Sequence, residues 1–143
     1  MTAHPVTDSR VRVNYSEVDQ MGVAYHARYL VWLDIARTEH LRAAGMAYKA
    51  LEARGYRLVV GSLQVRYRQP ARYDDPICVR CWTRSVESRR IVFGYALTHD
   101  DTGQLLATAT TDMLVLNDAM TPTRLPDDVS ALLVPVADPV RLA

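Results

Sequence analysis

The sequence lacks most of the features that would point directly to a class of protein. Its 143 residues carry a formal net charge of +1, which disfavours nucleic acid or an anionic membrane surface as the main partner. It has no apolar run approaching the roughly 20 residues of a membrane-spanning helix, so we expect no membrane insertion. The N-terminus has no apolar segment typical of a secretory signal, and we therefore expect a cytoplasmic protein. The length predicts a single domain over residues 1–143, with residues 1–9 as a loose tail.

Cysteine is scarce, and its spacing does not indicate a redox or metal site. Cys78 and Cys81 lie three residues apart in a predicted strand, where they would point to opposite faces about 10 Å apart, too far for a disulfide. No second cysteine pair completes a zinc site, and the histidines show no H-E-x-x-H spacing. The glycine-rich loops that bind nucleotide phosphates are also missing. We therefore expect neither a metal nor a cofactor.

What the sequence does contain is a polar turn followed by an apolar helical run. The turn covers residues 16–26, and the run from Tyr29 to Ala36 is almost wholly apolar. Because a helix that is apolar all round must be buried on all sides, we expect a central helix wrapped by the rest of the chain. It should end at Gly45, a natural left-handed stop, and a short second helix is expected over residues 46–54.

The rest of the chain is predicted to form strands. Alternation of apolar and polar residues predicts them over residues 10–15, 58–68, 77–86, 91–99 and 105–116, with a terminal turn and short helix over 122–133. In the second strand Val59, Leu63, Val65 and Tyr67 are expected on one face. Short connections favour antiparallel pairing. The pattern therefore predicts an α+β hotdog fold, with about five antiparallel strands wrapped around one long helix.

Asp19 is the candidate reacting group in the polar turn. Gly22 permits a tight turn beside it, and the first N–H groups of the following helix have no intrahelical partners and carry partial positive charge. Such donors can bind a developing oxyanion while a carboxylate attacks or activates water, which is a minimal acyl-transfer site. From spacing alone, however, capping the turn or the helix is the more common role for Asp19. A packing or hydrogen-bonding role is likewise more common for His26.

The turn and helix resemble the 4-hydroxybenzoyl-CoA thioesterase family of hotdog proteins, especially its short acyl-CoA thioesterase branch. The matching stretch, VNYSEVDQMGVAYHARYLVWLDIARTEHL, is similar to the family pattern Y-x-x-x-D-x-x-G-V-V-Y-H-x-x-Y, and YRQPARYDD over residues 67–75 is similar to Y-x-x-P-A-x-x-x-D. The resemblance covers about residues 10–130. It implies hydrolysis of an acyl-CoA or acyl-carrier-protein thioester to a free acid and a thiol.

The resemblance also implies roles for residues of the turn. Asp19 takes the place of the family's catalytic carboxylate, as general base or nucleophile, and His26 that of the residue whose backbone N–H polarises the thioester carbonyl. Gly22 and Tyr25 shape the turn and the acyl pocket. The family assembles its sites between subunits, so a homodimer or homotetramer is implied.

Arg89 and Arg90 are the remaining candidates for substrate binding. They fall where relatives place residues that contact pantetheine or nucleotide, although spacing alone favours a solvated hairpin end. The Ser-Glu-Val before Asp19 and the methionine at position 21 depart from the family pattern, so the acyl group stays open. Two alternatives also stay open: a hotdog hydratase or dehydratase, whose aspartate and histidine lie five residues apart instead of seven, and a non-catalytic protein that binds acyl thioesters.

Overall fold

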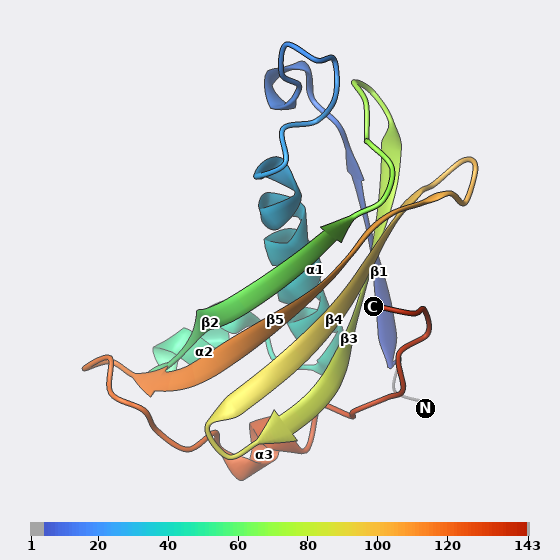
Figure 1. Cartoon of the computed structure of the whole chain (residues 1–143). Coiled ribbons are helices and arrows are strands. Elements are labelled where there is room, and N and C mark those ends of the chain that lie inside the picture. Colours follow the sequence, from blue (N-terminus) through green and yellow to red (C-terminus); the bar gives the residue numbers. More distant parts are fainter. Residues whose placement is uncertain (1–4, 143) are drawn as a thin grey trace.

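The computed structural model, which describes residues 5–142, places one long helix against one face of an antiparallel sheet (Figure 1). The sheet has five strands in the order β1-β3-β4-β5-β2, and all neighbours pair antiparallel. The strands are β1 (Val6–Arg12), β2 (Tyr56–Tyr67), β3 (Pro76–Glu87), β4 (Arg90–His99) and β5 (Leu105–Asn117). The helices are α1 (Arg28–Ala44), α2 (Tyr48–Ala53) and α3 (Asp127–Ser130), and a 3-10 turn covers Tyr15–Glu17. The predicted α+β hotdog fold is confirmed.

The first strand begins earlier than the sequence suggested. Residues 6–9, expected in a loose tail, belong to β1 and pair with β3, whereas residues 1–4 of that tail lie outside the described residues. The expectation failed because Thr7 and Ser9, although polar, point toward the core: Thr7 bonds to His40 of α1, and Ser9 is buried. Tyr15, the last residue of the strand predicted over residues 10–15, is 76% exposed because the chain leaves the sheet after Arg12.

A bulge in β2 corrects the predicted facing of that strand. The pairing with β5 shifts between Val60 and Ser62, which leaves Gly61 as the extra residue. A bulge of one residue moves the following side chains to the opposite face. Leu58, only 8% exposed, therefore shares the helix-facing side with Leu63 beyond the bulge, and Val59 does not.

Helix α1 is not buried on all sides, which corrects the expectation of a central helix wrapped by the rest of the chain. It makes its main contacts with β1 and β3, and its far side is open, with Leu30, Val31 and Ile35 exposed by 37%, 46% and 38%. The helix ends as predicted at Gly45, whose φ of +109° lies in the left-handed region. None of the helices within residues 5–142 has the length and apolarity needed to cross a membrane.

The buried side of α1 carries one histidine that joins the helix to the sheet. His40 is 5% exposed. Its Nδ1 lies 2.8 Å from the Thr7 hydroxyl and its Nε2 lies 3.0 Å from the Thr83 hydroxyl. Burial lowers the pKa of His40 to about 4, because charging an imidazole away from water is unfavourable. A neutral His40 therefore bridges β1 and β3 at neutral pH.

The two cysteines behave as the strand spacing predicted. Cys78 and Cys81 are buried free thiols on β3. Desolvation raises the pKa of both thiols, which keeps them protonated and unreactive. Within the described part of the chain, no group of three or more histidine, cysteine or acidic side chains is placed to hold a metal.

Candidate active site

Asp19 lies in a tight turn that its own backbone closes. Its N–H donates to the carbonyl of Val23, and its carbonyl accepts from the N–H of Gly22, both at 2.9 Å. Gly22 has a φ of +79°, a backbone conformation that residues with a Cβ atom adopt only with strain. Asp19 Oδ1 accepts from the N–H of Met21 at 2.9 Å. The turn-capping role is thus real for Oδ1 of Asp19.

This turn is held against both the helix and the loop after β2. The N–H of Ala24 donates to the carbonyl of Ala71 at 2.8 Å, and the N–H of Tyr25 donates to the carbonyl of Glu17 at 2.8 Å. The carboxylate of Glu17 accepts from the indole of Trp32 on α1 at 3.0 Å. These bonds fix the position of the Asp19 turn relative to the start of the helix.

The start of α1 presents backbone donors that the protein leaves unused. The helix begins at Arg28 with no side-chain cap, and the Arg28 N–H turns back to the carbonyl of Tyr25 at 2.8 Å. Across residues 5–142, the N–H groups of His26 and Ala27 meet no protein acceptor. The carbonyl of His26, by contrast, accepts a 2.7 Å hydrogen bond from the hydroxyl of Tyr67. Free donors at a helix start favour a negatively charged ligand atom.

Asp19 and His26 line the same cavity, which has a volume of about 290 Å³. Its remaining wall is largely apolar and includes Val23, Tyr29 and Tyr67. The two tyrosine rings meet edge to face, with centroids 4.9 Å apart. Burial raises the pKa of both hydroxyls, so they act as neutral hydrogen-bonding groups. The cavity therefore brings Asp19 and His26 together beside a largely apolar wall.

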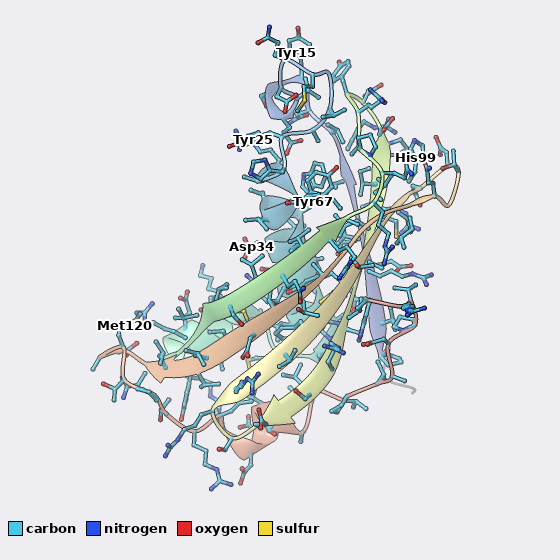
Figure 2. All side chains as sticks on the ribbon, in the orientation of Figure 1. Tyr15, Tyr25, Asp34, Tyr67, His99 and Met120 are labelled. Carbon is cyan, nitrogen blue, oxygen red and sulfur yellow. The ribbon has the colours of Figure 1, made fainter. Side chains whose placement is uncertain are left out.

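The other predicted site residues are placed differently. Tyr25 is 47% exposed and is not part of the cavity wall. Its ring packs on that of His26, with centroids 4.5 Å apart, and Figure 2 shows Tyr25 beside the start of α1. Arg89 and Arg90 lie at the hairpin between β3 and β4, at the opposite end of the sheet from the Asp19 turn (Figure 1). Arg90 is held there by Glu87 and by a carboxylate on β5. Within one chain, the structure does not bring these arginines to the cavity.

Sequence reasoning missed three residues that build the site. Tyr29 was counted only as part of an apolar run, although its hydroxyl accepts from the N–H of Ala71 at 3.0 Å. Glu17 was noted only as a departure from a family pattern. Tyr67 belongs to the YRQPARYDD stretch, which was a usable signal, but the sequence could not show that its hydroxyl meets the helix start.

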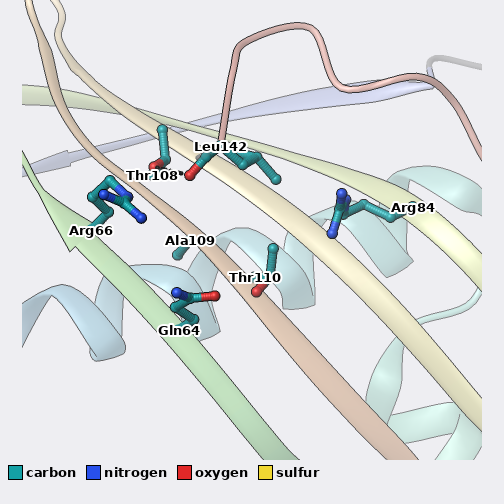
Figure 3. Close-up of a pocket in the computed structure, with 7 residues that line it drawn as sticks. All are labelled: Gln64, Arg66, Arg84, Thr108, Ala109, Thr110 and Leu142. Carbon is teal, nitrogen blue, oxygen red and sulfur yellow. Dashed lines mark hydrogen bonds between the residues drawn. The ribbon is translucent and has the colours of Figure 1, made fainter.

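A second hollow, of about 180 Å³, lies on the outer face of the sheet (Figure 3). Its lining contains arginine, threonine, glutamine, alanine and leucine side chains, and none of them is a histidine or carboxylate that could activate a threonine hydroxyl or a water. Its Arg84 is also neutralised by a two-pronged ion pair with Asp138, at 2.9 and 3.0 Å. The cavity at Asp19 is the candidate active site because it combines a carboxylate and the residue before a helix start with a largely apolar wall.

Comparison with known proteins agrees with this assignment of the fold. Residues 13–133 match the family model described as the thioesterase-like superfamily. The chain is similar to the putative acyl-CoA thioesterase YneP of Bacillus subtilis, with 30% identity over 78% of this chain and 80% of the relative. It is also similar to the acyl-CoA thioesterase YbgC of Haemophilus influenzae, with 33% identity over 85% of this chain and 89% of the relative.

A solved structure shows the same arrangement of strands and helix. The DHNA-CoA thioesterase from Staphylococcus aureus superposes with a TM-score of 0.81 at 27% identity, over 84% of this chain and 80% of that protein.

Proposed function

The chain belongs to the thioesterase-like superfamily and is an enzyme that hydrolyses thioesters, and from this premise we propose that Asp19 and the start of α1 act on an acyl-CoA. One observation carries the proposal: Asp19 and His26, seven residues apart in sequence, line one largely apolar cavity. An apolar wall suits an acyl chain, a carboxylate suits attack or water activation, and free N–H groups suit the oxyanion.

The proposed reaction is the transfer of the acyl group to water. With Asp19 as base, its carboxylate takes a proton from water as the water oxygen bonds to the thioester carbon. The N–H of His26 stabilises the negative charge that gathers on the carbonyl oxygen. The carbon–sulfur bond then breaks, and the thiolate leaves and is protonated. With Asp19 as nucleophile, a mixed anhydride forms first and water cleaves it, giving the same acid and thiol.

The substrate panel that tests this function compares acyl groups and carriers. Acetyl, medium-chain, long-chain and aromatic acyl-CoAs are each incubated with the enzyme, beside the corresponding acyl-carrier proteins, and free thiol is measured with DTNB. We expect thiol release from at least one acyl-CoA. Saturable binding without thiol release would instead support a non-catalytic acyl-thioester binder, and hydration of an enoyl-CoA without thiol release would support a hydratase. Release only from carrier proteins would move the substrate assignment away from CoA.

We also propose that the active form is a homodimer or larger assembly. Strand β2 is an edge of the sheet, and its Leu63, which faces the helix side, is 42% exposed. The open side of α1 adds Val31 and Ile35. An unpaired edge beside exposed apolar side chains is a surface that a second copy can cover. Arg89 and Arg90 lie far from the cavity of their own chain. Their predicted role in substrate binding therefore stays a prediction, and it requires the cavity of a second copy.

The assembly is tested by placing a charge on this surface. We expect light scattering to give at least twice the mass of one chain, and Leu63→Glu to lower that mass and the turnover together, because burying an unpaired carboxylate is unfavourable. Met120→Glu, at a position 56% exposed in the turn after β5, is the matched control and should change neither. A wild-type protein that is monomeric and fully active would contradict the shared assembly.

A further inference from the structure

The hydroxyl of Tyr67 links the edge of the sheet to the start of α1. Tyr67 is the last residue of β2 and donates a 2.7 Å hydrogen bond to the carbonyl of His26. Helix α1 makes its main contacts with β1 and β3, at the other side of the sheet. This hydrogen bond therefore ties the helix start to an edge strand that α1 otherwise contacts little.

Hydrogen bonds fix both peptide groups that flank the Cα atom of His26. The carbonyl of Tyr25, in the same peptide group as the N–H of His26, accepts from the N–H of Arg28 at 2.8 Å. The carbonyl of His26, in the next peptide group, accepts from Tyr67. Because both of these carbonyls accept hydrogen bonds, the two backbone torsions that set the direction of the His26 N–H, ψ of Tyr25 and φ of His26, have little freedom.

The same contact strengthens a second donor. The carbonyl of His26 and the N–H of Ala27 belong to one peptide group, and a hydrogen bond accepted by the carbonyl polarises the N–H at its other end. Because burial raises the pKa of the Tyr67 hydroxyl, the hydroxyl keeps its proton and remains a donor across the working pH range. Both unused N–H groups of the helix start are thus affected by one side chain.

We propose that Tyr67 is a positioning residue for the hydrolysis, holding the peptide groups around His26 so that their N–H groups are aimed before the oxyanion forms. The inference rests on the proposed function of the Asp19 cavity. An N–H group that already points at the position of the oxyanion needs no reorganisation during the reaction, and this is the main reason that it stabilises the transition state. Loss of the Tyr67 hydroxyl should therefore weaken the transition state more than substrate binding.

Tyr67→Phe isolates the hydroxyl, because the ring contacts with Tyr29 and His26 remain. We expect kcat to fall about ten-fold, less than the 10²–10³ of losing an oxyanion donor outright, with KM changed less than about two-fold. In ¹⁵N-labelled protein the amide resonances of His26 and Ala27 should shift. Tyr67 is 45% exposed, so the variant is expected to fold.

Tyr48→Phe is the matched control. It removes a tyrosine hydroxyl that also bonds to backbone, accepting from the Leu58 N–H at 3.0 Å, but on α2 and away from the cavity. It should lower the unfolding temperature without changing kcat or the two amide resonances. The inference is overturned if Tyr67→Phe keeps wild-type kcat, or if KM alone rises, which would make Tyr67 only a wall of the acyl pocket. Absence of thiol release by the wild-type protein would instead contradict the proposed function.

Discussion

Replacing Asp19 with asparagine is expected to lower kcat by about 10² to 10⁴, the range attributed to a positioned general acid or base. Asparagine keeps an Oδ1 that can accept from the N–H of Met21, so the turn should persist. It cannot take a proton from water and is a poor nucleophile. The expected result is thus a folded protein with normal substrate binding and little turnover, measured by DTNB under saturating acyl-CoA.

The Asp19 experiment needs a matched carboxylate elsewhere. Asp101→Asn makes the same change in the exposed turn between β4 and β5 and should leave kcat unaltered. Unfolding curves and ¹⁵N spectra of both variants should match the wild type. If Asp19→Asn retained wild-type kcat, Asp19 would be only a turn cap, the role that spacing alone favoured.

Acid should destabilise the protein through His40, by as much as about 3 kcal/mol. The pKa is about 4 in the folded state, against about 6.5 in an unfolded chain, and each unit of difference corresponds to about 1.4 kcal/mol. Because the folded pKa is the lower one, the unfolded state binds the proton more readily. The stability that depends on neutral His40 is therefore fully present above about pH 6.5 and is lost as the pH falls toward 4.

Urea unfolding at several pH values between 7.5 and 4 measures this effect. Carboxylates also titrate at the acid end, so the wild type is compared with His40→Gln. The variant should be less stable at pH 7.5, because the Thr7 and Thr83 hydroxyls lose well-placed partners. Its free energy of unfolding should then fall less steeply between pH 6.5 and 5. Parallel pH profiles for the two proteins would show that His40 does not cause the loss.

The elements that could be predicted from the sequence are those whose pattern is local. Alternation in β3, β4 and β5 located those strands within one or two residues, and a glycine after an apolar run located the end of α1. The turn containing Asp19 was found for the same reason, since Gly22 and the polar residues around it are contiguous.

The misplaced features depend on partners that are distant in sequence. Thr7 is polar by composition, and only its contact with His40 explains why β1 starts early. The bulge at Gly61 is visible only through its pairing with β5. The apolar residues of α1 predicted burial, but a sequence does not state whether the covering surface comes from the same chain or from another. The link between Tyr67 and His26 spans 41 residues and follows from no periodicity.

The open edge at β2 bears on how this protein can change over evolution. In an assembly where two copies meet through the same edge, each substitution there occurs on both sides of the contact at once. An effect that is small in one chain is therefore doubled, and an unfavourable charge at Leu63 has no independent partner that can compensate for it. In the proposed homodimer, these positions should consequently tolerate less variation than exposed positions elsewhere on the chain.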